Sequence, residues 1–172
     1  MKQLVAVNVH TVVPSPVGDL ILVACDDALV GLYMAGQKHL PDDEHFGAQR
    51  SPPVFEDARA QLDEYFAGER RHFELPLAPM GNEFRLSVWG ELNRIPYGET
   101  RTYGQLAANL GEPQMAQAVG AANGRNPIAI IIPCHRVIGA DGSLVGFAGG
   151  LDRKRYLLEH EQKVVGTWSR LF

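Results

Sequence analysis

The sequence predicts a mixed α/β fold of the α+β kind, with an antiparallel sheet and one helix first and a mainly helical half after them. Strand-like runs fill the first 34 residues, whereas apolar residues recur at helical spacing after residue 52. Leu77–Gly81 has the Pro and Gly content of a linker. A chain of 172 residues suffices for one ordinary domain or two small ones, and we place a boundary near residue 80, giving domains 1–80 and 81–172.

The first half begins with strands. Residues 4–34 contain three strand-like runs separated by turn signals, which predicts antiparallel pairing; the first run carries alternating Val5, Val7 and Val9. Residues 36–51 are polar and predict a loop. Ser51 is the expected N-cap of a helix that starts at Pro52 and ends at Gly68. Phe73 and Leu75 predict a last strand.

The second half begins with helices. Asn82 caps a helix whose predicted core face consists of Phe84, Val88, Leu92 and Ile95. Thr102 and Gln105 have capping-box spacing, and the helix they open ends at Leu110–Gly111. Another helix runs from Pro113 to about Asn123. Two short helices joined by a Gly-containing turn indicate a helix-turn-helix. The small residues of the second helix fit close core packing or close approach to a groove, and both interpretations stay open.

One stretch carries the candidate chemistry. The β-branched run Ile128–Ile132 predicts a buried strand, which Pro133 stops, so that Cys134 begins a turn or short helix. A helix N-terminus favours the thiolate. A Cys-His pair alone fits a buried structural pair equally well. Because adjacent side chains do not face each other, we expect a water to link Cys134 to His135, and Glu161 to orient the histidine.

The segment after the cysteine is rich in glycine. Gly139–Ser143 predicts a tight turn, and Gly146–Gly150 predicts a flexible loop, either a connector or a place where backbone approaches a flat ligand. A last helix begins near Asp152. Its Arg153–Arg155 run is expected on a solvated face.

Composition narrows the function. Two cysteines make no disulfide framework, and the N-terminus lacks a secretory pattern, so a cytoplasmic protein is expected, without a membrane span. The net charge of −4 and pI of about 5.8 argue against DNA binding through a generally basic surface. Any DNA contact must use a local face, with modest affinity that falls with salt.

The motifs, taken together, resemble one family. The order of Tyr103–Ala107, Ala118–Gly120, Asn126–Pro127, Pro133–Val137, Gly149–Gly150 and His160–Glu161 is similar to that of the O6-alkylguanine-DNA alkyltransferases. The resemblance is strong over residues 82–161 and only general before them. It implies a ribonuclease-H-like N-terminal sheet and a C-terminal DNA-binding and alkyl-transfer domain.

The resemblance implies direct-reversal DNA repair without a cofactor. An O6-alkylguanine flipped out of double-stranded DNA would give its alkyl group to the Cys134 thiolate, once and permanently. O4-alkylthymine is left open as a second substrate. By position, His135 and Glu161 complete the relay, Asn126 holds its water, and Tyr103 supplies a proton to the guanine. We expect a monomer and leave clustering along DNA open.

The resemblance also implies a minor-groove contact through the second helix. The residues expected at DNA or substrate are Ala116, Gln117, Ala118, Gly120, Arg125, Val137, Phe147, Ala148 and Gly149. Three features depart from the family. Gln117 replaces an arginine, which predicts weaker DNA binding or flipping; Phe147 replaces a frequent tyrosine; and Cys25 with scattered histidines predicts no metal site.

Two other functions compete. Alkyltransferase-like proteins sense alkylated guanine without reacting, but they lack the cysteine that this chain has. A cysteine hydrolase built on Cys134, His135 and Glu161 is disfavoured by the adjacent Cys-His pair.

Overall fold

The computed structural model describes residues 6–166. Its N-terminal half is a sheet with strand order β3-β2-β1-β4. The strands are β1 (Asn8–Val13), β2 (Leu20–Cys25), β3 (Ala28–Met34) and β4 (Ala48–Gln49). The β1–β2 and β2–β3 pairs are antiparallel, with Val12 opposite Ile21 and Leu22 opposite Leu32. The predicted strands at 20–25 and 28–34 are confirmed, while β1 starts only at Asn8; Val5 lies outside the described residues.

The predicted loop at 36–51 is wrong in part. It contains the short helix α1 (Asp43–Phe46) and β4, which pairs with β1 in parallel. Asp42 caps α1 by accepting a hydrogen bond from the His45 amide at 3.0 Å. Phe46 packs with Val23, Val30 and Tyr33 on one face of the sheet. The short helix therefore forms because its buried ring covers apolar strand residues.

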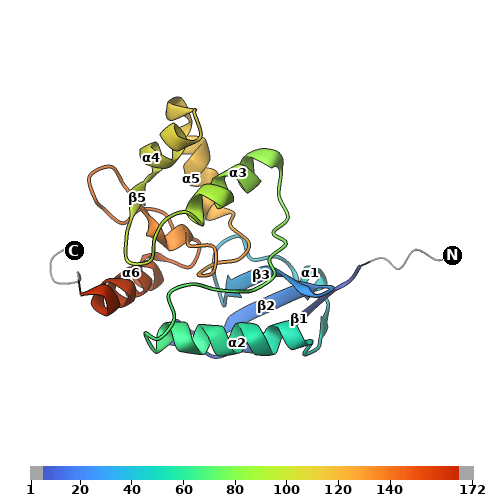
Figure 1. Ribbon diagram of the computed structural model, residues 1–172. Coiled ribbons are helices and arrows are strands. Elements are labelled where there is room, and N and C mark those ends of the chain that lie inside the picture. Colours follow the sequence, from blue (N-terminus) through green and yellow to red (C-terminus); the bar gives the residue numbers. More distant parts are fainter. Residues whose placement is uncertain (1–5, 167–172) are drawn as a thin grey trace.

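The other face of the sheet is covered by α2 (Pro53–Phe66), as Figure 1 shows. Phe55, Ala58, Leu62 and Tyr65 form its buried side, as their helical spacing predicts. Ser51 is not the N-cap: Pro52 takes that place and makes no side-chain cap bond. The strand predicted around Phe73 and Leu75 is absent from the described chain, and both side chains pack against the core from a loop.

The C-terminal half is mainly helical. Its α-helices are α3 (Glu83–Leu92), α4 (Tyr103–Asn109), α5 (Ala116–Gly124) and α6 (Leu151–Val165). Single 3₁₀ turns, η1 (Pro113–Met115) and η2 (Cys134–Arg136), precede α5 and follow Pro133. Strands β5 (Arg101–Thr102) and β6 (Val137–Ile138) pair in parallel. The Asn82 cap and the Thr102–Gln105 capping box are both confirmed.

The two halves meet along the edge strand β3 (Figure 1). Leu32 donates its amide hydrogen to Pro127 at 2.8 Å and accepts from Ala129 at 3.1 Å. One hydrophobic cluster runs from sheet residues such as Leu22 through Tyr65 of α2 to Trp89 of α3. The segment before Cys134 is therefore fixed against the N-terminal sheet.

Candidate functional site

The segment before the cysteine is a folded turn and not the predicted strand. Only Ile128 makes a β-bridge, with Leu32. The chain then reverses, with the Ile132 amide donating to the Ile128 carbonyl at 3.0 Å. Ile130 has φ +71°, a left-handed conformation that is a clear outlier for a β-branched residue. The run is as buried as predicted, but tertiary contacts and not strand pairing explain its apolar character.

Asn126 holds this turn with both ends of its amide. Its Nδ2 donates to the Ile132 carbonyl at 2.8 Å, and its Oδ1 accepts from the Ile128 amide at 3.0 Å. Asn126 is 7% exposed. Such doubly satisfied buried amides rigidify a turn. The side chain thereby sets where the following cysteine lies.

Cys134 is the first residue of η2 and is 5% exposed. Burial raises the pKa of the Cys134 thiol, although the Asn126 side chain and the charge of Lys154 oppose this rise. The prediction that a helix N-terminus lowers the pKa of this thiol is therefore wrong, because the net shift is upward. One 3₁₀ turn aligns too few peptide dipoles to outweigh desolvation.

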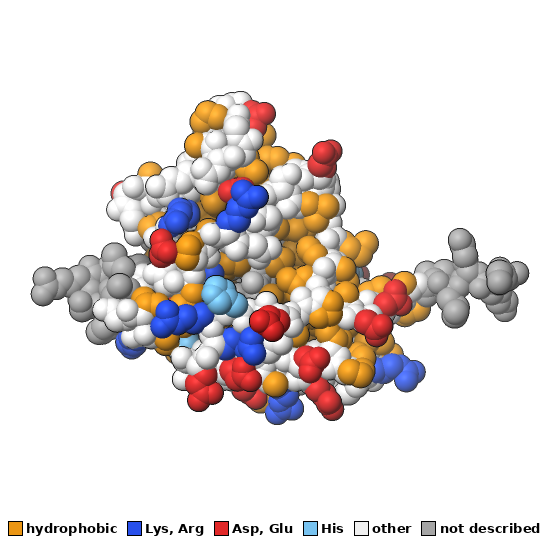
Figure 2. Space-filling view, viewed as in Figure 1, with side chains coloured by type: hydrophobic (Ala, Val, Ile, Leu, Met, Phe, Trp, Pro, Cys, Tyr) orange, Lys and Arg blue, Asp and Glu red, His pale blue; other side chains and the backbone are white. Residues whose placement is uncertain are grey.

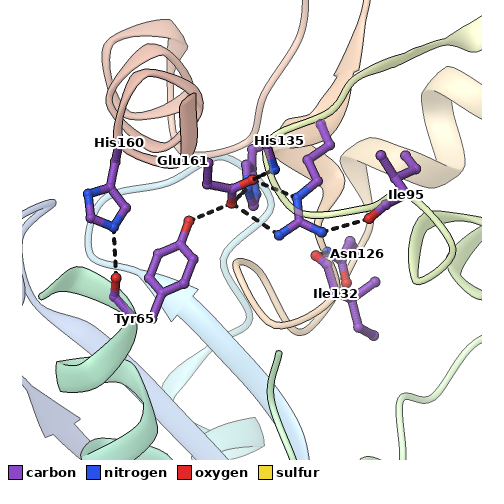
Figure 3. A network of polar contacts seen from close by, with 9 residues as sticks. Tyr65, Ile95, Asn126, Ile132, His135, His160 and Glu161 are labelled. Carbon is purple, nitrogen blue, oxygen red and sulfur yellow. Dashed lines mark hydrogen bonds and ion pairs between the residues drawn. The ribbon is translucent and has the colours of Figure 1, made fainter. Parts of the chain in front are cut away.

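His135 and Glu161 form a buried pair, drawn in Figure 3. The distance from His135 Nε2 to Glu161 Oε2 is 2.6 Å. A carboxylate only accepts hydrogen bonds, so Nε2 carries the proton and Nδ1 keeps a free lone pair. Nδ1 is buried and has no hydrogen-bond partner among residues 6–166. Burial lowers the pKa of His135 despite the nearby carboxylate, which keeps the ring neutral at neutral pH.

Glu161 accepts from more groups than the sequence predicts. Arg136 donates from Nε to Oε1 at 2.8 Å and from a terminal nitrogen to Oε2 at 3.2 Å, while the Tyr65 hydroxyl donates to Oε2 at 2.6 Å. Burial alone would raise the pKa of Glu161, but His135 and Arg136 together hold it well below its ordinary value. Arg136 and Tyr65 were both missed as site residues. The only sequence feature that could have indicated a site role for Arg136 is its position directly after the Cys-His pair.

The environment of Lys154 differs from the prediction. The sequence predicts a solvated face of the last helix for this residue, but its side chain is fully buried. Its ammonium donates to the carbonyls of Val137, Val145 and Gly146, the last two at 3.1 and 3.2 Å. Burial lowers the pKa of Lys154 to about 8. Arg153 is half-buried and donates to the Val17 carbonyl, so only Arg155 of this run is exposed.

A cavity of about 370 Å³ lies between α5, the start of α4 and the loop at 146–148. Its walls include Tyr103, Gly120, Arg125, Phe147 and Ala148, all predicted at the site, and also Lys38 and His39 of the N-terminal half, which were not predicted. A smaller cavity of about 10 Å³ continues toward Cys134 and is lined by Asn126 and Gly149. The structure thus gathers most of the predicted substrate residues beside the cysteine.

Tyr103 lies on the wall of the larger cavity. Its hydroxyl donates to the Val145 carbonyl at 2.8 Å. Burial, with a smaller effect of Cys134, raises the pKa of Tyr103, so its phenol is protonated at neutral pH. Gly149 is required sterically, since a Cβ there would come within 2.5 Å of the Met34 sulfur.

Helix α5 has two distinct faces. Val119 and Ala122 are buried, and the Trp89 indole donates to the Ala122 carbonyl at 2.9 Å. Gln117 and Arg125 are exposed on the other side; Ala116, Ala118 and Gly120 lie at the margins. Core packing therefore accounts for the buried side of the helix, while approach of its exposed side to a groove stays a prediction. Val137 is fully buried below the cysteine turn.

Asn123 was not predicted as a site residue. Its Nδ2 donates to the Cys134 carbonyl at 3.3 Å, which ties α5 to the cysteine turn. Its Oδ1 is buried without a hydrogen-bond partner in the described part of the chain. Within residues 6–166, no group of three His, Cys, Asp or Glu residues could hold a metal ion, and no helix is long and apolar enough to cross a membrane.

Two family models match the chain. The ribonuclease-like domain of 6-O-methylguanine DNA methyltransferase matches residues 8–79, and the DNA-binding domain of the same family matches residues 83–163. A methylated-DNA–protein-cysteine methyltransferase of Mycobacterium leprae is 50% identical over 158 residues, covering 92% of this chain and 94% of that protein. The Methanosarcina acetivorans protein of the same name is 48% identical over 153 residues, covering 88% and 97%.

Solved structures agree with these sequence matches. The crystal structure of Mycobacterium tuberculosis OGT in complex with DNA superimposes with a TM-score of 0.84 at 46% identity, covering 90% of this chain and 93% of that chain. The M. tuberculosis O6-methylguanine methyltransferase gives 0.83 at 47% identity, covering 91% and 93%. The chain therefore belongs to the 6-O-methylguanine DNA methyltransferase family.

Proposed function

We propose that this protein repairs DNA by direct reversal, moving an alkyl group from O6 of guanine onto the Sγ atom of Cys134. One observation carries the proposal: in a chain of this family, the single cysteine of the C-terminal half lies beside a cavity and next to a buried His–Glu pair. This arrangement makes Cys134 the acceptor of the alkyl group, because a thiolate is the strongest nucleophile available in the site. Membership of the family indicates the reaction class.

Proton removal from Cys134 is assigned to a relay. The neutral His135 offers its Nδ1 lone pair to a water that also contacts the thiol, and Glu161 stabilises the imidazolium that forms. Asn126 and Lys154 favour the resulting thiolate. Because burial raises the pKa of the thiol, Cys134 would stay protonated at neutral pH without a base. The relay supplies that base.

The transfer is a single displacement at the alkyl carbon. A bond forms between Sγ and the alkyl carbon while the bond from that carbon to O6 breaks, and its electron pair passes to the guanine. Tyr103 supplies a proton to the guanine as it leaves, because its phenol is protonated and lines the cavity. The product is a thioether, a poor leaving group, so each molecule reacts once.

We assign DNA binding to the exposed side of α5, in the minor groove, with the damaged base flipped into the cavity. The charge distribution supports this assignment. Residues 1–80 contain 12 acidic and 6 basic side chains, whereas residues 81–172 contain 8 and 10. On the face drawn in Figure 2, acidic side chains gather around α2, away from α5. A monomeric state and clustering along DNA stay predictions.

Intact mass spectrometry tests the proposal. After incubation with a duplex that contains one O6-methylguanine, the chain should gain one methyl group, and peptide mapping should place it on Cys134. Cys134→Ser is the matched control and should stay unmodified. Binding of the lesion with unchanged mass in the unsubstituted protein would support the sensing alternative and contradict the transfer. Loss of the lesion from several equivalents of DNA per protein would contradict the single turnover.

A further inference from the structure

The phenol of Tyr65 reaches the catalytic relay from the N-terminal half. Tyr65 lies on α2, 96 positions before Glu161, yet its hydroxyl donates to Glu161 Oε2 at 2.6 Å (Figure 3). The same oxygen accepts from His135 Nε2 at 2.6 Å. Both Tyr65 and Glu161 are fully buried. The helix that covers the sheet therefore contacts the group that orients the histidine.

The contact constrains the carboxylate in a way that the other donors do not. Arg136 bonds to both oxygens and the Gly98 amide bonds to Oε1 at 3.2 Å. Among residues 6–166, Tyr65 is the only donor to this carboxylate that comes from the N-terminal half. Burial, and then the charge of Glu161, raise the pKa of Tyr65 well above its ordinary value. Its phenol therefore stays a hydrogen-bond donor throughout the working pH range.

We propose that Tyr65 is a positioning residue for alkyl transfer, acting through Glu161 and His135 on Cys134. This inference rests on the proposed function. With the phenol in place, Oε2 is held in one position. The hydrogen bond from Tyr65 also makes Oε2 a weaker acceptor for the proton of His135. Without it, the carboxylate would become a stronger acceptor for the imidazolium and would be free to shift, and the His135 ring bonded to it would shift as well.

The structure offers a matched control in Tyr97. This side chain is buried, and its ring lies 6.1 Å from that of Tyr65. It also faces Arg136, whose guanidinium carbon lies 5.5 Å from the ring centroid. Its hydroxyl, however, has no hydrogen-bond partner among the described residues. Tyr97→Phe thus removes the same atom from the same cluster without removing a donor from Glu161.

The first experiment compares single-turnover methylation rates of full-length Tyr65→Phe, Tyr97→Phe and unsubstituted protein at saturating O6-methylguanine DNA across pH. Tyr65→Phe should slow transfer about tenfold, as a small misplacement of a catalytic group does. The acidic limb of the rate–pH profile of Tyr65→Phe should move to higher pH, because a more basic Glu161 stabilises protonated His135. The other charged groups acting on the pair, Arg136 and Lys154, are unchanged in this comparison. Tyr97→Phe should match the unsubstituted protein in rate and in pH profile.

The second experiment asks whether Tyr65 acts through the carboxylate. In a Glu161→Gln background, adding Tyr65→Phe should cause little further loss, because the two changes interrupt one path. Equal losses in both backgrounds would show a merely structural role and overturn the inference, as would a Tyr65→Phe profile identical to that of Tyr97→Phe. Rates are taken below each variant's unfolding midpoint, so that they refer to folded protein. If the unsubstituted protein transfers nothing, the proposed function fails and not this inference alone.

Discussion

At the scale of single residues, Glu161 joins groups that are far apart in the sequence. A buried carboxylate is tolerated only when it is paired and fully hydrogen-bonded, and here an arginine, a histidine, a tyrosine and a backbone amide satisfy it. The same charge that stabilises the imidazolium thus also holds α6, η2 and α2 together. If the proposed relay operates, catalysis and stability depend on the same side chain.

Glu161→Gln should therefore lower the free energy of unfolding at pH 7 by about 3–5 kcal/mol, because it leaves the Arg136 charge buried without its partner. The pKa of Glu161 is lowered in the folded protein, so its contribution is complete above the ordinary carboxyl pKa and is lost as pH falls through the folded value. Urea unfolding should show the difference from the unsubstituted protein shrinking below about pH 4. Glu159→Gln on the same helix serves as the control and should change little at either pH.

Lys154→Met tests the buried ammonium. The substitution removes the positive charge that favours the Cys134 thiolate and takes one hydrogen-bond donor away from each of three carbonyls. The pKa of the thiol should rise further, so methylation at neutral pH should slow by about tenfold, the effect of one pKa unit, and recover partly as pH increases. Rates measured from pH 6 to 9 would check this. Arg155→Met removes an exposed charge from the same helix, and a similar loss there would contradict the assignment.

At the scale of elements, local rules predicted some parts and failed at others for identifiable reasons. The Thr102–Gln105 capping box joins residues three apart, so the sequence contains all of its information. The turn at Ile128–Ile132 does not follow from its own residues, since β-branched side chains favour a strand. Ile130 has a positive φ in a turn that Asn126 and the pairing with Leu32 hold in place. Contacts as distant as Tyr65 to Glu161 leave no local signal.

The exposed side of α5 supports a prediction about affinity. Gln117, which the family resemblance places where relatives have an arginine, is exposed. Gln117→Arg should tighten binding to duplex DNA and make the logarithm of affinity fall more steeply with the logarithm of salt concentration, by about one unit of slope for one added phosphate contact. Fluorescence anisotropy at several salt concentrations would measure both. Ala60→Arg adds the same charge on α2. An equal gain in affinity for this variant would show that the effect comes from added charge and not from the position of residue 117 on α5.

At the scale of the whole molecule, the continuous core argues against independent halves. The hydrophobic cluster crosses residue 80, and Leu32 pairs with the segment before the cysteine turn. The division into 1–80 and 81–172 stays a prediction for independent folding units. Because Tyr65 also contacts Glu161, loss of either half should remove both the core and the relay.

We expect one cooperative unfolding transition. Urea curves followed by tryptophan fluorescence, which includes the buried Trp89, should coincide with curves followed by far-ultraviolet circular dichroism. Two separated midpoints would show that the halves unfold one after the other and that the shared core contributes little to either.

The unequal division of charge between the halves has a consequence before any contact with DNA. A molecule that is negative at one end and slightly positive at the other has an electric dipole moment, and the field of a polyanion exerts a torque on it. The protein should therefore arrive at a duplex already turned with its helical end foremost. Since screening shortens the range of that field to about 8 Å at physiological ionic strength, added salt should reduce the fraction of productive collisions without altering the chemistry that follows them.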